Sequence, residues 1–136
     1  MPTLKDIQWM DLKSISDPRG VLTAIESEID IPIEIKRIFY MHHVTDDRGG
    51  HAHYETDQLI IGVSGSFEIE LYDGFEKKKY ILNDPTKGLY VPRMIFLNLM
   101  NFTKDAVCMV LANTHYKENE YIRNIDDYIK IISTKK

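Results

Sequence analysis

Two histidines, His51 and His53, stand one residue apart in the segment Arg48-Gly49-Gly50-His51-Ala52-His53. Side chains two positions apart on a β-strand point to the same face of its sheet, so both imidazoles converge on one pocket if that face is internal. Histidine titrates near neutral pH, and such a pair can hold and move protons. A His-x-His pair also occurs by chance on a surface or in a hydrogen-bonded core, so the surrounding elements must decide its role.

Alternating polar and apolar residues predict strands along most of the chain. Residues 66–72 place Phe67, Ile69 and Leu71 on one face and glutamates on the other. Asp73-Gly74 then predicts a tight turn before a returning strand at residues 79–82. Segments rich in Ile, Val, Tyr and Phe predict further strands at residues 20–25, 33–44, 58–63, 89–91 and 107–112.

Only the C-terminus has a helical pattern. Ile122, Ile125, Ile129 and Ile132 recur at spacings of three and four, which places them on one face of a helix. Many short strands followed by a terminal helix predict an all-β sandwich or barrel, whose interior suits a small ligand. No repeat or linker interrupts the chain, so we expect residues 1–136 to form a single domain.

The composition argues against several functions. A net charge of −4 does not favour binding to nucleic acid or to a membrane surface. No segment approaches the roughly 20 consecutive apolar residues that span a bilayer. The lone Cys108 excludes an internal disulfide, which suits a reducing compartment, and the first residues lack the apolar core of a signal peptide. We therefore expect a cytoplasmic protein.

The histidine segment resembles the first motif of the cupin superfamily. Gln58 follows His51-x-His53 after four residues, where metal-binding cupins have a glutamate, and Gly65 follows after six more. Residues 88–98 resemble the second cupin motif, but Leu97 stands where that motif has a metal-binding histidine. Two imidazoles alone make a poor site for a divalent ion, which usually needs three or four protein ligands. We therefore expect no metal, and histidines free to act as acid and base.

Across nearly its whole length the chain resembles the sugar 3,4-ketoisomerases that act on dTDP-4-keto-6-deoxyglucose. The matching elements, in order, are Asp17-x-Arg19-Gly20 with residues 24–26, then residues 35–40, Arg48-Gly49-x-His51-Ala52-His53, and residues 88–91, 109–112 and 120–123. The resemblance implies a cupin jelly roll, a homodimer and an isomerase that needs no cofactor. It also implies a place in dTDP-3-amino-3,6-dideoxysugar biosynthesis, for lipopolysaccharide or another surface glycan.

The resemblance also implies a mechanism. A base removes the proton at C3, which the C4 carbonyl acidifies, and the resulting enediol(ate) is reprotonated at C4. His51 matches the catalytic base of the family. His53 could move the oxygen-bound proton or fix the sugar. Tyr40 or a protonated His53 could donate a hydrogen bond to the enediolate oxygen.

Three arginines are candidates for the diphosphate or the sugar, because a guanidinium binds phosphate bidentately. Arg19 and Arg48 lie in the two motifs that the ketoisomerases share with the related dTDP-sugar 3,5-epimerases, and Arg19 could serve its own pocket or that of a second subunit. On a strand, Arg37 lies on the same face as Phe39 and Met41, whereas Tyr40 lies on the opposite face. Only one of these two sets can face the pocket.

Two other functions remain open from the sequence. The motifs of Arg19 and Arg48 also resemble those of dTDP-sugar 3,5-epimerases, although a lysine soon after the histidine and a tyrosine acid are not evident. The third reading is a cupin that binds a nucleotide sugar without catalysis. Pro18, Leu97 and Asn98 leave the C4 configuration of the product, gluco or galacto, open as well.

Overall fold

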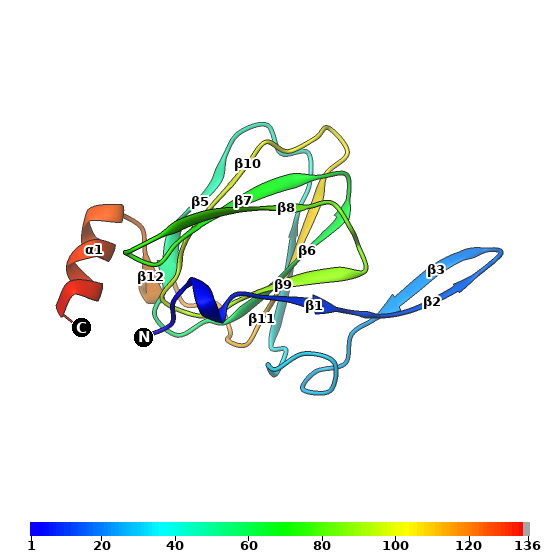
Figure 1. Cartoon of the computed structure of the whole chain (residues 1–136), viewed down its shortest axis with the longest axis horizontal. Helices are drawn as coiled ribbons and strands as arrows, with labels where there is room; N and C mark the ends of the chain where they lie inside the picture. The colour runs from blue at the N-terminus through cyan, green and yellow to red at the C-terminus, as the bar shows by residue number, and fades with distance from the viewer. Residues whose placement is uncertain (135–136) are drawn as a thin grey trace.

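The computed structural model describes residues 1–134 as a sandwich of two five-stranded antiparallel sheets (Figure 1). The first sheet contains, in spatial order, β1 (Gln8–Asp11), β9 (Lys87–Val91), β6 (Gln58–Ser64), β11 (Val107–Ala112) and β4 (Arg37–Met41). The second contains β12 (Tyr121–Ile122), β5 (Arg48–His53), β10 (Phe96–Met100), β7 (Phe67–Tyr72) and β8 (Lys77–Leu82). Two single-turn 3₁₀ helices, η1 (Leu4–Asp6) and η2 (Glu118–Glu120), precede β1 and β12. The prediction of an all-β jelly-roll architecture is confirmed.

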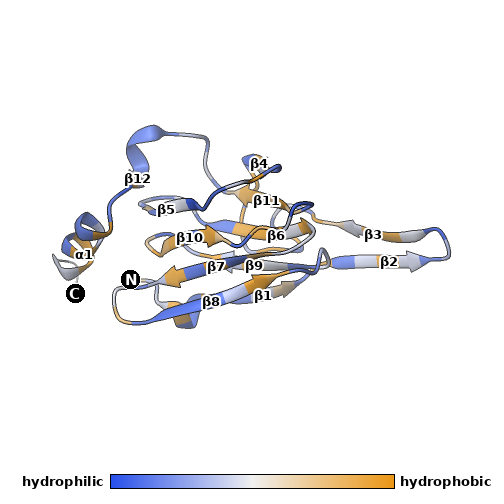
Figure 2. Ribbon diagram, turned by 90° about the horizontal axis from the view of Figure 1, so that it is seen from above, coloured by the Kyte–Doolittle hydropathy of each residue, from blue (hydrophilic) through white to orange (hydrophobic). Residues whose placement is uncertain are grey.

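Apolar side chains from both sheets meet in a shared buried cluster between them. Ile60 and Val110 of the first sheet belong to the same buried cluster as Ile69, Leu71 and Leu97 of the second. The inward positions of β7 alternate with partly exposed ones, as the sequence predicts, and apolar colouring marks the central strands in Figure 2. Removal of this apolar area from water is the main stabilising contribution to the sandwich.

The strand predicted at residues 33–44 is too long. β4 covers only Arg37–Met41. The residues before it belong to a compact loop, in which the Ile35 N–H donates to the Ser27 hydroxyl at 2.8 Å instead of joining a ladder. Ile33 is buried as an anchor of that loop. Its apolar character therefore indicates loop packing, which a short sequence pattern does not distinguish from a strand.

The C-terminal helix α1 (Ile125–Thr134) begins later than predicted. Ile122 is not helical but lies in β12, where it pairs with Ala52 of β5. Asn124 caps the helix, because its side-chain oxygen accepts the N–H of Asp126 at 2.8 Å. No helix within residues 1–134 is long and apolar enough to cross a membrane.

α1 packs against its own sandwich. Tyr128 is fully buried and its hydroxyl donates to the Met94 carbonyl at 2.7 Å, and Ile132 is buried beside it. Ile125 and Ile129 are 37% and 39% exposed. The buried stripe therefore comes from Tyr128 and Ile132, and only part of the predicted isoleucine face is covered.

A two-stranded hairpin, β2 (Lys13–Asp17) and β3 (Gly20–Ala24), extends away from the sandwich (Figures 1 and 2). Ile15, Val21 and Leu22 on it are each more than 60% exposed. An apolar hairpin exposed to water is costly, and such surfaces commonly mark a contact with another chain.

Candidate active site

A cavity of about 220 Å³ lies between the two sheets, at the β4 and β5 side of the sandwich. Its polar lining consists of Arg48, His51, Gln58, Tyr121 and Arg123. Its apolar lining consists of Phe39, Met41, Ile60, Leu97, Leu99 and Val110. The cavity is smaller than the ~300–1,000 Å³ typical of whole ligands, so it suits one ring of a larger molecule.

A β-bulge in β5 sets the direction of His51. The register between β10 and β5 shifts at this point, since Leu97 pairs with His51 while the next residue, Asn98, pairs with Gly49. Gly49 and Gly50 have φ of +87° and +74°, and a Cβ on Gly49 would lie 3.0 Å from the Leu97 side chain. Bulges are common beside active sites because they redirect a side chain.

The two imidazoles lie together, as the strand alternation predicts. The ring centroids of His51 and His53 are 4.9 Å apart, with the planes nearly perpendicular. The Tyr121 ring contacts both, at 5.0 Å from His51 and 4.5 Å from His53. His51 lines the cavity, whereas His53 is only 3% exposed and lies behind it.

His51 is neutral at physiological pH. Burial above all, and then the charge of the neighbouring His53, lower its pKa from the usual 6.5 to about 4, against the opposing effect of a hydrogen bond to the Gly49 backbone. The ring therefore presents an unprotonated nitrogen in the cavity, which is the form that a general base requires.

His53 is held between a carboxylate and an amide. Its Nδ1 lies 2.6 Å from Oε2 of Glu120, and its Nε2 lies 3.3 Å from Nε2 of Gln58. The other oxygen of Glu120 accepts the N–H of Glu55 at 3.1 Å. Burial lowers the pKa of His53 and outweighs the opposing effect of Glu120. His53 is thus a fixed, neutral ring.

Three arginines give the cavity region a positive charge. Arg48 and Arg123 line the cavity. The Arg37 guanidinium lies between Phe39 and Tyr116, at 5.4 and 5.6 Å from the ring centroids. Its Nε and Nη2 atoms are buried and have no hydrogen-bond partner among residues 1–134. Buried donors without a partner are rare and call for a ligand or water.

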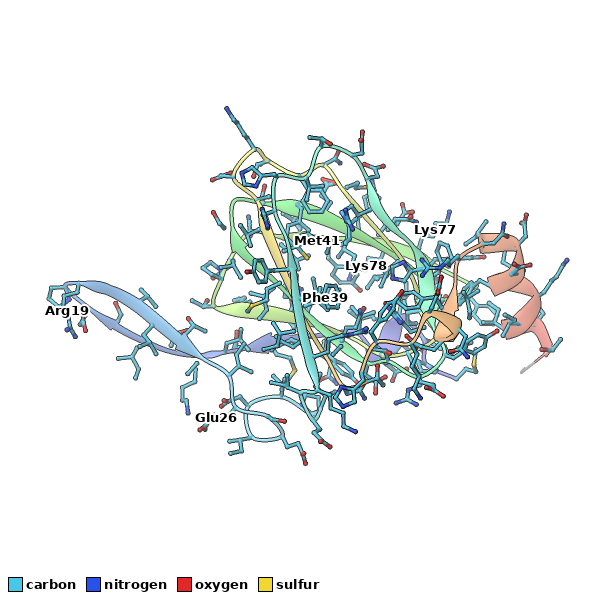
Figure 3. The ribbon with its side chains drawn as sticks, turned by 180° about the vertical axis from the view of Figure 1, so that it is seen from behind. Arg19, Glu26, Phe39, Met41, Lys77 and Lys78 are labelled. Atoms are coloured by element: carbon cyan, nitrogen blue, oxygen red, sulfur yellow. The ribbon has the colours of Figure 1, made fainter. Side chains whose placement is uncertain are left out.

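One face of β4 points into the cavity and the other points to solvent. Phe39 and Met41 line the cavity (Figure 3). The alternating burial along β4 places Arg37 on the same face. Tyr40 is 64% exposed on the opposite face. Tyr40 therefore does not line the cavity of its own chain, because successive residues of a strand point to opposite faces.

Arg19 is not part of the cavity of its own chain. It lies at the outer end of the hairpin, remote from Phe39 and Met41 (Figure 3). Its side chain is 90% exposed and bonds to Asp17 of the same turn at 2.8 Å. Of the predicted substrate-binding residues, the fold brings Arg37 and Arg48 to the histidines and leaves Arg19 outside.

The fold also brings in residues that the sequence analysis did not select. Glu120 ends η2, Tyr121 begins β12 and Arg123 directly follows that strand. Glu120 and Tyr121 contact the histidine pair, and Arg123 lines the same cavity as His51. The sequence signal was their presence in the closing segment of the family resemblance. Nothing in their spacing connects them to His53, which is 67 residues away from Glu120.

The described part of the chain contains no cluster of three or more His, Cys, Asp or Glu side chains placed to hold a metal ion. Gln58 and Leu97 both line the cavity at the positions where metal-binding cupins have ligands. A carboxamide is a weak ligand and an alkyl side chain is none. The site offers proton-transfer groups and cations.

A jelly roll with a neutral histidine in a cation-rich cavity between its sheets defines a cupin with an acid–base site. The chain belongs to the FdtA family: the family model described as "WxcM-like, C-terminal" matches residues 5–133. This agrees with the resemblance seen in the sequence.

Known relatives share most of the chain. It is 37% identical, over 91% of both chains, to the TDP-4-oxo-6-deoxy-α-D-glucose-3,4-oxoisomerase of Aneurinibacillus thermoaerophilus. It is 39% identical to QdtA, a sugar 3,4-ketoisomerase from Thermoanaerobacterium thermosaccharolyticum crystallised with TDP, with a TM-score of 0.94 over 98% of each chain. A mutant of that enzyme in complex with TDP-4-keto-6-deoxyglucose gives 38% identity and a TM-score of 0.93 over 97% of each chain.

The sugar epimerases are more distant. A dTDP-4-dehydrorhamnose 3,5-epimerase from Bacillus anthracis is 16% identical, with a TM-score of 0.73 over 89% of this chain and 79% of its own. At this identity the likeness extends to the fold alone.

Proposed function

We propose that this protein is a sugar 3,4-ketoisomerase that converts dTDP-4-keto-6-deoxyglucose to a dTDP-3-keto-6-deoxyhexose. The observation that carries the proposal is the neutral His51 in the cavity of a chain that is 37–39% identical to 3,4-ketoisomerases over more than nine-tenths of its length. The relatives act on or bind TDP-linked sugars, as their names state. A dTDP-linked 4-keto-6-deoxy sugar is accordingly the proposed substrate.

The reaction needs one base beside the C3–C4 edge of the sugar. His51 takes the C3 proton, and the electron pair of the C3–H bond forms the C3–C4 double bond of an enediolate, with the charge on O4. The proton on His51 then adds to C4, while the O3 proton moves to O4 and the carbonyl forms at C3. The substrate carbonyl is the electron sink, so the proposed reaction needs no cofactor.

The environment of His51 favours this proton cycle. The neutral ring is ready to accept a proton, and burial makes the resulting imidazolium a good donor to C4. The cations Arg48 and Arg123 line the same cavity and would stabilise the enediolate oxygen as its charge develops. They take the place of Tyr40, which faces away.

The arginines also suit the diphosphate. Arg37 has two buried donor atoms without a partner among the described residues, and Arg48 lines the cavity at its β5 side. Guanidinium groups bind phosphate oxygens bidentately, and in a partly desolvated site these contacts are strong. A diphosphate beside the cavity would satisfy the free donors of Arg37 while the sugar ring enters the cavity.

We also propose that the protein is a homodimer in which the hairpin of one subunit covers the other. The exposed Ile15, Val21 and Leu22 need an apolar partner surface. β4 is the edge strand of its sheet in the described part of the chain, and its own Ile38 is 56% exposed. Arg19 at the hairpin tip would then reach the partner's site. A cytoplasmic location is part of this proposal, and the single buried Cys108 suits it.

The deciding experiment is incubation with dTDP-4-keto-6-deoxyglucose followed by product NMR. The ketoisomerase moves the carbonyl from C4 to C3, whereas a 3,5-epimerase leaves it at C4 and inverts two centres. Binding of dTDP-sugars without any turnover would favour the non-catalytic cupin instead. A product carbonyl that stays at C4 would overturn the proposal.

A further inference from the structure

Gln58 stands at the end of a buried hydrogen-bonded chain that begins at Glu120. Glu120, His53 and Gln58 are 4%, 3% and 4% exposed. The chain runs from Glu120 Oε2 to His53 Nδ1 at 2.6 Å, and from His53 Nε2 to the Gln58 side-chain amide at 3.3 Å. Of these three side chains, only Gln58 lines the cavity. The chain therefore links a buried carboxylate to the cavity wall.

The two hydrogen bonds that join Gln58, His53 and Glu120 are both donated toward Glu120. Both oxygens of the Glu120 carboxylate lie against nitrogen atoms: Oε1 accepts the backbone N–H of Glu55 at 3.1 Å, and Oε2 lies 2.6 Å from Nδ1 of His53. An ionised carboxylate only accepts, so the hydrogen between Glu120 and His53 sits on Nδ1. His53 is neutral, and its one ring hydrogen is used here.

The direction fixes the orientation of the Gln58 amide. Because His53 Nε2 carries a lone pair and no hydrogen, the group at 3.3 Å must be the NH₂ of Gln58. The Gln58 carbonyl oxygen then points to the other side of the amide. No residue in the described range 1–134 donates a hydrogen bond to this oxygen, and it is not among the buried unpartnered atoms, so it faces the cavity.

This oxygen has a distinct chemical role in the cavity. Arg48 and Arg123 can only donate hydrogen bonds, and the His51 lone pair is reserved for the carbon-bound proton. The Gln58 carbonyl is therefore a neutral acceptor for a hydroxyl hydrogen, and unlike the Tyr121 phenol, which also lines the cavity, it has no hydrogen of its own to donate. Since C1, C4, C5 and C6 of the proposed substrate carry no hydroxyl, the donor is the hydroxyl at C2 or C3.

We propose that Gln58 is a positioning residue that accepts a hydrogen bond from the C2 or C3 hydroxyl of the sugar, and that Glu120 sets this polarity through His53. The proposal rests on the sugar-nucleotide substrate of the proposed function. It gives a physical reason for an amide at this position. A carboxylate at residue 58 could not donate to His53 Nε2, so a neutral His53 would leave two acceptors facing each other.

The first test reads the tautomer of His53 directly, by ¹⁵N NMR of the histidine-labelled protein without ligand. We expect a protonated Nδ1 and an unprotonated Nε2 in the wild type. In Glu120→Gln we expect a shift toward a mixture of tautomers, because the neutral amide can donate as well as accept. A wild-type His53 with its hydrogen on Nε2 would reverse the amide of Gln58 and overturn the proposal. This result does not depend on any enzymatic activity.

The second test measures affinity by calorimetry, with dTDP, dTDP-glucose, and its 2-deoxy and 3-deoxy analogues as unreactive probes. Wild type should bind dTDP-glucose about five- to tenfold more tightly than one of the deoxy analogues. Gln58→Met should lose that preference and keep its affinity for dTDP, whereas Gln8→Met, an exposed control on β1, should keep both. Thermal unfolding of each variant verifies that it is folded.

The outcomes separate this inference from the proposed function. If Gln58→Met retains the full preference for the hydroxylated sugar, the role of Gln58 is refuted while the substrate class stands. If wild type fails to bind dTDP-glucose at all, the proposed substrate is refuted, and with it this role. If Gln58→Met does not fold, Glu120→Gln is the second variant. It should weaken the preference for the hydroxylated sugar and leave the affinity for dTDP unchanged. An unaltered preference would contradict the proposed effect of Glu120 on Gln58 through His53.

Discussion

Leu97 is the cross-strand partner of His51: they face each other on β10 and β5, and both side chains line the cavity. The second cupin motif has a metal-binding histidine at this position. Leucine has no donor atom, and its side chain also fills the space beside Gly49. Leu97 thus places an apolar side chain where metal-binding cupins have a ligand. The neutral imidazole of His51 can act as a base beside this apolar surface.

Activity should therefore be insensitive to metal removal. With Gln58 and Leu97 in place of a carboxylate and an imidazole, two histidines are too few ligands for a tightly held divalent ion. Product formation should be unchanged after dialysis against EDTA. As a matched contrast, the Gln58→Glu, Leu97→His double variant restores four cupin ligands and should retain zinc through dialysis, as measured by elemental analysis. A wild-type enzyme inactivated by EDTA and restored by zinc would contradict this account.

Replacing His51 with asparagine should abolish proton transfer at carbon. Asparagine keeps much of the polarity and size of the ring but is no base at neutral pH. We expect a rate loss of at least about 10²–10⁴-fold and no deuterium from D₂O in the sugar, with dTDP affinity retained. His115→Asn, at an exposed histidine, is the control and should remain active. Undiminished deuterium incorporation by His51→Asn would remove His51 from the mechanism.

The pH dependence should report the low pKa of His51. Only the neutral ring accepts the C3 proton, and burial lowers its pKa to about 4, so protonation removes activity only as the pH falls through about 4. We expect kcat/KM to be constant from about pH 6 to 8. Circular dichroism at each pH distinguishes this loss from acid unfolding. A decline centred near 6.5, the ordinary value for histidine, would show that His51 is not desolvated in the free enzyme.

The alternation of residues along the strands was enough to predict several features of the fold and of the site. The convergence of His51 and His53, the two alternative faces of β4 and the alternation in β7 all follow from a period of two. The same pattern could not choose between the two faces of β4, because each carries an aromatic residue, Phe39 on one and Tyr40 on the other. That choice depends on which face the opposite sheet covers, and it placed Phe39 inside and Tyr40 outside.

Contacts between distant segments could not be predicted from the pattern. Glu120 reaches His53 because β12 pairs with β5, so that Tyr121 lies opposite His53. β12 has only two residues, too few to show alternation. The apolar Ile122 of this strand instead extended the helical spacing of the isoleucines that follow. A short strand beside a helix is therefore read as part of that helix.

Arg19 should act in the partner's active site, and subunit mixing can show this. Light scattering should give a dimer, and Leu22→Lys on the exposed hairpin should weaken it. Arg19→Ala and His51→Asn should each be nearly inactive as pure dimers. Dimers that combine one subunit of each contain one site with an intact His51 and an intact Arg19 from the other chain.

Since random mixing makes half of the dimers mixed, the recovered activity should be about a quarter of the wild-type value. If Arg19 served its own subunit, every site in the mixed dimer would lack one of the two groups, and no activity would return. The control is a mixture of each variant with itself under the same refolding or exchange conditions. The extended hairpin, with Arg19 90% exposed and far from its own cavity, is the reason to expect recovery.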